Sequence, residues 1–410
     1  MRQETLDNLA TTNLYGTMKI LAIHNAYQQY GGEDIVARLE SELLDQHGNA
    51  CHRYVVSNKQ ISGVLSKIAA AFGVVFSFSS FRTVRKLIQE IKPDVVHVHN
   101  FFPLISPSVF YACNAEGVPV VLTLHNYRII CPTAVMMHAG VVTERSIQEG
   151  PWWSIMHRVY RGSLTGTFLL CLMIFVHLRL GTWRNMVDRI IVLSQFAHTR
   201  FSKAGIPTDS MVVKPNFVDI PPPIAFNRSG LLFVGRLSPE KGIEVLLSAA
   251  NSMIAIGKAP HRTITVVGAG PLAKSVGEGP VLSLGALPAD AVEQHMQRSV
   301  ALLLPSIWYE GFPMVLVEAY ANGLPVIASR IGALAELVED GVTGLLFEPG
   351  NADDLTEKMV WALTHPDEMR RMGDAARARY EALYTPERNY EQLVSIYQEA
   401  IISNARKRQI

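Results

Sequence analysis

The chain has 410 residues, of which 49% are hydrophobic, and its formal net charge is +1. This length exceeds that of one ordinary domain and favours two domains of about 200 residues each. The composition excludes a coiled coil, a collagen-like repeat and a disordered protein, and the balanced charge gives no global field for nucleic acid.

The beginning of the chain and its cysteines indicate a cytoplasmic protein. Residues 1–17 are polar without an apolar centre, so we expect a loose extension and no signal peptide, with the folded chain starting near Met18. The four cysteines have neither metal-ligand spacing nor the pattern of a secreted disulfide framework. We therefore predict reduced thiols and no metal site.

Strands and helices are predicted to alternate in the first half of the chain, which is typical of a doubly wound parallel sheet. Apolar runs predict strands over 18–25, 52–56, 94–99, 118–124 and 189–193. Gly31 and Gly32 stand between the first strand and the following helix, where glycines let a backbone approach a ligand closely. The alternative is a plain tight turn in which Glu33 and Asp34 complement the helix N-terminus.

Histidines stand at the ends of two of these predicted strands. One strand ends in His97-Val-His99-Asn, and another is followed by His125-Asn-Tyr-Arg. Ligands of such sheets collect outside the carboxyl ends of the strands. We interpret His97 as structural and treat His99 and His125 as candidates for ligand contact.

Residues 150–183 interrupt the alternation with an apolar segment. The run from Phe168 to Val176 is uninterrupted but remains short of the roughly 18 residues that a membrane-spanning helix needs. Two interpretations remain open: a buried helix, or a helix in a membrane interface with tryptophans and arginines at its margins. These flanking residues are Trp152, Trp153, Trp183, Arg158, Arg161, Arg179 and Arg184. A second apolar stretch, over 64–78, is ambiguous in the same way.

The second half opens after a proline run at 221–223, which marks a domain boundary. A strand that starts at Leu231 is predicted to end at Arg236, a loop with Lys241 follows, and a helix begins near Ile243. Two cations between a strand end and a helix N-terminus can neutralise a diphosphate, although ordinary surface charge would give the same pattern.

A glycine motif follows the next strand. Gly268-Ala-Gly270-Pro-Leu-Ala273 has the form of a dinucleotide-binding fingerprint, which requires an acidic residue about 20 positions further on, at the end of a strand. Asp290 is predicted to start a helix instead. This context disfavours a nicotinamide-binding site.

Two carboxylates flank the start of a predicted helix over 313–322. Pro313 suits its first position, and Gly323 suits the residue just past its end. Because the first turn of a helix offers unpaired N–H groups, this start is suited to a phosphate, with Glu310 and Glu318 on sugar and ribose hydroxyls. The alternative is a surface loop with a capping glutamate, followed by a core helix.

Together these motifs resemble the retaining, nucleotide-sugar-dependent glycosyltransferases of group 1, which have the GT-B fold. The stretch from Glu310 to Glu318 is similar to their Glu-x7-Glu motif, and Gly235-Arg236 with Lys241-Gly242 is similar to their diphosphate signature. The resemblance implies two Rossmann-like domains facing a cleft. These would be an acceptor domain over 18–218, on which a helix over 386–402 packs back, and a sugar-nucleotide domain over 219–385.

The resemblance also implies roles for individual residues. Arg236 and Lys241 would stabilise the leaving diphosphate, Glu310 would orient the donor sugar, and His125 would lie near it. Glu318 would hold the ribose. The other expected donor contacts are Gly235, Gly268, Gly270, Leu287, Gly311, Phe312, Pro313, Met314 and Val315, with Gly31 and Gly32 next to the diphosphate and the acceptor.

The implied reaction moves a sugar from a UDP- or GDP-sugar to a saccharide or lipid-linked saccharide with retention of configuration, in cell-surface polysaccharide synthesis. Since the cations would replace a metal, neither a divalent ion nor a cofactor is expected. A membrane surface is a further expected partner, which would place the protein in the cytoplasm or on the inner face of the cell membrane. A sugar-nucleotide epimerase, a nicotinamide-dependent oxidoreductase and a non-catalytic scaffold are the alternatives.

Overall fold

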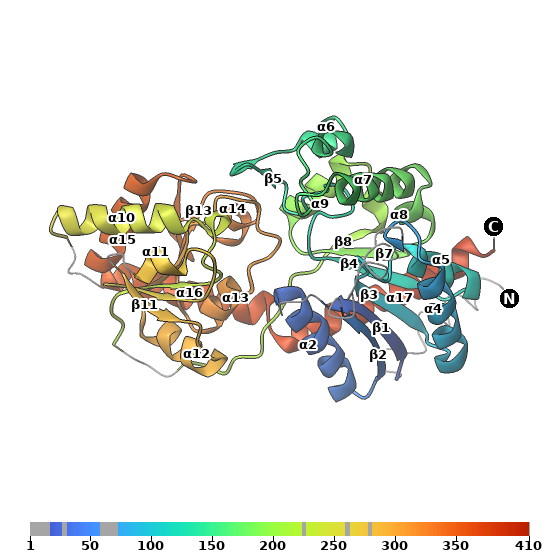
Figure 1. Ribbon diagram of the computed structural model, residues 1–410. Helices are drawn as coiled ribbons and strands as arrows, with labels where there is room; N and C mark the ends of the chain where they lie inside the picture. Colours follow the sequence, from blue (N-terminus) through green and yellow to red (C-terminus); the bar gives the residue numbers. More distant parts are fainter. Residues whose placement is uncertain are drawn as a thin grey trace. The chain divides into compact units, whose positions relative to one another are not determined.

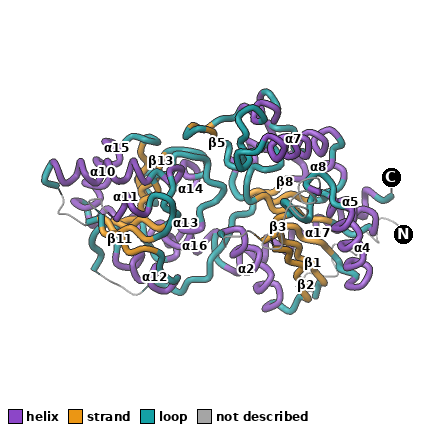
Figure 2. Tube along the Cα trace, viewed as in Figure 1, coloured by secondary structure: helices purple, strands orange, loops and turns teal. Residues whose placement is uncertain are grey.

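The computed structural model describes residues 17–26, 31–57, 73–223, 227–258, 263–277 and 281–409. Its strands form two six-stranded parallel sheets and one two-stranded antiparallel hairpin (Figures 1 and 2). The predicted doubly wound α/β fold is therefore confirmed. Residues 1–16 of the expected extension and residues 64–72 of the second apolar stretch lie outside the described residues.

The first sheet has the strand order β2-β1-β3-β4-β7-β8. Both β3 and β4 are buried along their whole length, as expected for valine-rich strands in the middle of a parallel sheet. In the register of the sheet, Ile20 pairs with Cys51 on one side and Val95 on the other. The strands are β1 (Lys19–Ala26), β2 (Ala50–Ser57), β3 (Val95–Asn100), β4 (Val120–Leu124), β7 (Arg189–Val192) and β8 (Met211–Val213).

Helices connect these strands. Helix α4 begins at Phe78 because the Ser77 hydroxyl caps it, accepting from the N–H of Ser80. The last helix returns to this sheet: the Tyr397 hydroxyl lies 2.8 Å from Nδ1 of His97. The helices are α2 (Gly32–Gln46), α4 (Phe78–Ile91), α5 (Ser108–Glu116), α6 (Arg145–Gln148), α7 (Leu164–Arg179), α8 (Thr182–Asn185), α9 (Gln195–Lys203) and α17 (Pro386–Lys407).

The second sheet has the order β11-β10-β9-β12-β13-β14, with strands β9 (Leu231–Val234), β10 (Ile264–Val267), β11 (Leu282–Gly285), β12 (Ala301–Leu304), β13 (Val326–Ser329) and β14 (Gly344–Phe347). Its core joins strand residues such as Phe233 and Leu303 to helix residues such as Leu246 and Met359. The helices are α10 (Ile243–Ala255), α11 (Ala273–Gly277), α12 (Ala289–Arg298), α13 (Met314–Ala321), α14 (Leu334–Leu337), α15 (Ala352–Thr364) and α16 (Pro366–Leu383).

The chain packs as two compact units. The first contains Met1–Thr123, Gly181–Ile190 and Val394–Ile410, and the second contains Leu124–Leu180 and Ile191–Leu393. The predicted domain boundary near residue 218 stays a prediction.

The apolar segment predicted over 150–183 forms helix α7, which is buried on one side and exposed on the other. Its three flanking tryptophans, which the interfacial interpretation places at a membrane margin, differ in exposure, and contact of this segment with a membrane stays a prediction. Trp183 is buried, with its ring centroid 5.5 Å from that of Phe110. Trp153 is half-buried and donates through Nε1 to the Ser146 hydroxyl, 2.9 Å away. Trp152 alone of the three is exposed.

Candidate functional site

The loop between β9 and α10 carries the two predicted cations. It contains a 3-10 turn over Pro239–Lys241 and reaches α10 through Gly242, whose φ is 71°. The Arg236 side chain is exposed, whereas only a quarter of the Lys241 side chain is exposed. The N–H of Ile307 donates to the carbonyl of Glu240 at 3.0 Å, which joins this loop to the loop after β12.

Glu310 lies in the second of these loops and contacts the first. Lys241 Nζ lies 2.7 Å from Glu310 Oε1, and the Ser306 hydroxyl donates to the same oxygen at 2.6 Å. Glu310 is only 5% exposed, and Lys241 Nζ lies 5.4 Å from the centroid of the Trp308 ring. Both contacts therefore use the same carboxylate oxygen, Oε1.

Ser306 and Trp308 belong to this site, although the sequence alone gives neither of them a role. The available signal was their position in the same loop, four and two residues before Glu310. A serine at that spacing can only be assigned to the carboxylate once the loop conformation is known.

Gly242 allows the close approach between the two loops. A Cβ atom at this position would lie 1.8 Å from the carbonyl oxygen of Pro305, at the end of β12. Its positive φ adds strain to any other residue.

We expect Gly242→Ala to lower the free energy of unfolding by about 3 kcal/mol or more, because the clash with rigid backbone adds to the backbone strain. Gly257→Ala is the matched control, since Gly257 lies just past the other end of α10 with φ of 66° and a Cβ atom there would have nothing within 4 Å. Calorimetry of the two variants measures the difference. Equal losses of stability in both would contradict the close-approach argument.

Helix α13 starts one residue later and ends one residue earlier than predicted. Pro313 is its N-cap rather than its first residue, because its ψ of 107° is extended, and Asn322 is its C-cap. Gly323 follows the end as predicted, with φ of 58°. The N–H groups of Met314 and Val315 lie in the first turn and have no partner within the helix.

The two residues before Pro313 are Gly311 and Phe312, and each has a different packing role. Phe312 is buried, with its ring centroid 6.0 Å from that of Tyr384, so its side chain serves packing. A Cβ atom on Gly311 would lie 2.6 Å from the carbonyl oxygen of His125. The buried His125, after β4, is thereby close to the loop that carries Glu310.

Glu318 lies in the second turn of α13 and is half-buried. Burial raises the pKa of its carboxyl above the ordinary value of 4.5. The native state therefore holds this proton more tightly than the unfolded chain. The resulting stabilisation is complete at low pH and decreases as the pH rises above 4.5.

We expect Glu318→Gln to raise the melting temperature near pH 7 and to bring this gain towards zero near pH 4, because glutamine does not titrate. Thermal melts of both proteins from pH 4 to 8 test the sign. Melting temperatures that run parallel over this range would show that burial of the carboxylate has no net cost.

The predicted nucleotide-binding glycines meet at the carboxyl ends of β9 and β10. A Cβ on Gly268 would lie 1.8 Å from the carbonyl oxygen of Gly235, and a Cβ on Gly270 would lie 2.4 Å from that of Leu237. Close backbone packing therefore requires Gly268 and Gly270. Leu287 lies half-buried in the turn after β11.

Asp290 lies in the first turn of α12 and not at the end of β11. The acidic residue that a nicotinamide dinucleotide requires at the strand end is thus missing from that position. The prediction that Asp290 starts a helix is confirmed.

Gly31 and Gly32 belong to the first compact unit. Gly31 has an extended backbone with φ of −135°, and its N–H donates to Asp34 Oδ2 at 2.8 Å. Asp34 Oδ1 lies 2.8 Å from Nε2 of His24. Asp34 therefore caps the helix as the tight-turn interpretation predicts, and the place of both glycines beside a diphosphate stays a prediction.

The histidines of β3 lie in the core of the first unit. Tyr397 and Thr123 hydroxyls each lie 2.8 Å from one ring nitrogen of His97, which confirms its structural role. His99 is buried, with Nε2 3.7 Å from Oε2 of Glu40, and its contact with a ligand stays a prediction. Glu40, His97 and His99 are near enough to share a metal ion, but both ring nitrogens of His97 are engaged by hydroxyls.

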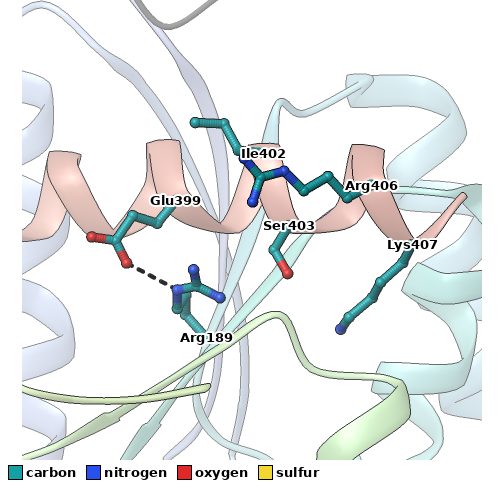
Figure 3. Close-up of a pocket in the computed structure, with 6 residues that line it drawn as sticks. All are labelled: Arg189, Glu399, Ile402, Ser403, Arg406 and Lys407. Carbon is teal, nitrogen blue, oxygen red and sulfur yellow. Dashed lines mark hydrogen bonds and ion pairs between the residues drawn. The ribbon is translucent and has the colours of Figure 1, made fainter. Parts of the chain in front are cut away.

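A surface pocket of about 370 Å³ lies beside the end of α17 (Figure 3). Within it, Arg189 Nε lies 2.9 Å from Glu399, and Lys407 Nζ lies 3.0 Å from Asp188. These ion pairs engage two of its basic groups, and none of the predicted site residues lines it. The lining residues are Arg189, Glu399, Ile402, Ser403, Arg406 and Lys407.

Comparisons with known proteins cover both halves of the chain. Residues 51–220 match the model of Glycosyltransferase Family 4, and residues 224–379 match that of Glycosyl transferases group 1. Phosphatidyl-myo-inositol mannosyltransferase of Mycolicibacterium smegmatis is 30% identical over 74% of this chain and 70% of its own length. An uncharacterized glycosyltransferase of Methanocaldococcus jannaschii is 24% identical over 74% of each chain. The structure of Anabaena HepE in complex with UDP has a TM-score of 0.64 at 20% identity, covering 92% of this chain and 99% of that one.

Proposed function

Because the chain belongs to the glycosyl transferases group 1 family and has the GT-B fold, we propose that its donor is a nucleotide diphosphate sugar and its acceptor a saccharide or lipid-linked saccharide. The observation that carries the proposal is the buried carboxylate of Glu310 held by Lys241. A UDP-sugar is the first donor to test, since HepE has been solved with UDP and with UDP-glucose.

The charges of the site suit departure of a nucleoside diphosphate. Lys241 and the exposed Arg236 lie on the same loop and would neutralise the negative charge that develops on the leaving group. First-turn N–H groups of α13 would add to this stabilisation. With these groups in place, the proposed reaction requires no divalent metal.

The carboxylates would hold the donor by its hydroxyls. Oε2 of Glu310 would accept from the sugar, and Glu318 would accept from the ribose. Retention would follow when the acceptor hydroxyl attacks from the face that the diphosphate leaves. The bond from C1 to the phosphate oxygen breaks, the bond to the acceptor oxygen forms, and the hydroxyl proton passes to the leaving phosphate.

The acceptor proposal rests on chemistry named for relatives. The relative from Mycolicibacterium smegmatis is named for phosphatidyl-myo-inositol, a lipid carrying a polyol headgroup. A membrane-anchored saccharide acceptor of that kind fits a role in cell-surface polysaccharide synthesis. Such an acceptor would bring the protein to the inner face of the membrane.

A donor panel tests the function. UDP- and GDP-sugars are incubated with the protein in the presence of EDTA, with and without saccharide acceptors, and nucleoside diphosphate release and product configuration are followed. We expect one donor class to be consumed, and an α-linked donor to give an α-linked product. A rearranged sugar nucleotide formed without acceptor would indicate an epimerase, and turnover requiring a nicotinamide would indicate an oxidoreductase. Consumption of no donor would favour a scaffold.

A further inference from the structure

The second compact unit carries an exposed apolar ridge on and beside α7. We define this ridge by Trp152, Met156, Leu164, Phe168, Phe175 and Leu180, each of which is between 37% and 82% exposed. Helix α7, labelled in Figure 1, packs against the 3-10 turn Pro151–Ser154 that carries Trp152. Large exposed apolar side chains are ordinary when scattered, but a contiguous group indicates a docking surface.

The sequence of α7 explains why these side chains reach solvent. Leu164, Phe168 and Phe175 are four and seven residues apart, so they follow one side of the helix, with the half-buried Leu172 between the two phenylalanines. The opposite side is also apolar and fills the core, with buried residues that include Leu170, Met173 and Ile174. A helix that is apolar all round has no polar side to turn towards water.

Three aromatic side chains of the ridge pack together. The ring centroid of Trp152 lies 5.3 Å from that of Phe175 and 6.2 Å from that of Phe168. Aromatic rings at such separations support one another. The tryptophan from the 3-10 turn therefore joins two turns of α7 into one continuous apolar face.

Within residues 150–187 all the charged side chains are arginines, and the exposed Glu149 just before them is paired with Arg145 at 2.9 Å. Residues 150–187 contain no aspartate or glutamate but contain four arginines, of which Arg158, Arg161 and Arg179 are exposed in the same unit. The Arg179 guanidinium lies 5.4 Å from the Phe175 ring centroid, and that of Arg161 lies 5.5 Å from the Tyr160 centroid. Arg179 thus stands beside the apolar face, and Arg158 and Arg161 lie in the segment between Trp152 and Leu164, where the three cations would meet anionic groups.

We propose that the ridge binds the surface of a bilayer containing anionic lipids, with α7 lying in the plane of the interface. The apolar side chains would enter the boundary between headgroups and acyl chains, and the arginines would contact lipid phosphates. Helix α7 has 16 residues, so its length of about 24 Å is shorter than the roughly 30 Å hydrocarbon core. No helix in the described part of the chain is long and apolar enough to cross a membrane.

A second copy of the chain fits the same face less well. Pairing two identical ridges about a twofold axis would bring three exposed arginines of each copy together, while Glu149, the carboxylate just before this segment, is already paired with Arg145. Like charges opposed across an interface oppose association. An anionic bilayer complements the ridge in both hydrophobicity and charge.

Vesicle co-sedimentation of the full chain without nucleotide or acceptor tests the proposal independently of the transfer reaction. Vesicles of phosphatidylcholine alone are compared with vesicles containing equal parts phosphatidylglycerol. We expect at least about tenfold stronger binding to the anionic vesicles, weakened by 0.5 M salt. The Phe168→Ser, Phe175→Ser double variant should lose about tenfold or more of this binding.

Matched variants separate the ridge from general hydrophobicity and from unfolding. Ile256→Ser with Leu383→Ser removes two other exposed apolar side chains of the same unit and should leave binding unchanged. The Arg158→Gln, Arg161→Gln double variant should bind the anionic vesicles more weakly and should bind the phosphatidylcholine vesicles as the unchanged protein does. Unchanged melting temperatures show that each variant is folded.

Three outcomes would overturn the membrane proposal. These are equal binding to both kinds of vesicle, undiminished binding by the phenylalanine double variant, and a concentration-dependent dimer that the same variant dissociates while no vesicles are bound. The last outcome would assign the ridge to a second copy of the chain. Because donor hydrolysis is not measured, failure here leaves the proposed transfer reaction standing.

Discussion

Lys241→Met should lower kcat/KM by about 10²- to 10³-fold, the usual cost of removing one preorganised group that stabilises developing negative charge. The proposed reaction places a diphosphate next to the loop before α10, and Lys241 is the cation of that loop that contacts Glu310, at 2.7 Å. Methionine keeps most of the length of the side chain and removes the charge. Initial rates with the donor found in the panel measure the effect.

The contact with Glu310 gives Lys241 a second role, since loss of the cation leaves a carboxylate that is only 5% exposed without its partner. That loss is destabilising in itself. The double variant Lys241→Met, Glu310→Gln separates the two roles by removing both charges. We expect it to recover the melting temperature lost in Lys241→Met and to recover no activity. Recovery of activity together with stability would mean that neither the Lys241 nor the Glu310 charge takes part in the reaction.

Glu310→Gln should lower kcat by about 10²-fold while leaving the fold intact. Glutamine has the same shape and can still accept from the Ser306 hydroxyl, which lies 2.6 Å from Oε1. It loses the negative charge that would hold the donor hydroxyls, and hydrogen bonds to charged groups are worth about 1.5–3 kcal/mol. Single-turnover kinetics with saturating donor measures the chemical step.

Ser306→Ala is the comparison for Glu310, since it removes one hydrogen bond to the carboxylate without altering the charge of the site. We expect a loss of about tenfold or less, because Lys241 still holds the same oxygen. A larger loss in Ser306→Ala than in Glu310→Gln would show that the hydroxyl, and not the carboxylate, is the functional group.

The order of strands and helices could be predicted because the two periodicities are clear in this chain. Strands β3 and β4 are valine-rich, fully buried runs, and the sequence predicts them over 94–99 and 118–124. The start of α13 was misplaced by one residue because proline is compatible with both the N-cap and the first helical position.

Contacts between distant residues could not be predicted from spacing. Lys241 and Glu310 are 69 positions apart, and His97 and Tyr397 are 300 positions apart. Each pair meets because the sheet and its helices bring remote segments together. The same limit applies to α7, whose apolar residues surround the whole helix and give no periodic signal for the side that is exposed.

By itself the sequence determined the α/β class and the carboxylate, arginine and lysine motifs of a group 1 glycosyltransferase, since strand periodicity and loop composition are local properties. The tertiary structure alone decided that Lys241 and Ser306 hold one oxygen of Glu310, that His99 is buried beside Glu40, and that α7 exposes an apolar ridge. These features depend on which segments pack together. That packing is settled by burial and close backbone approach over the whole chain.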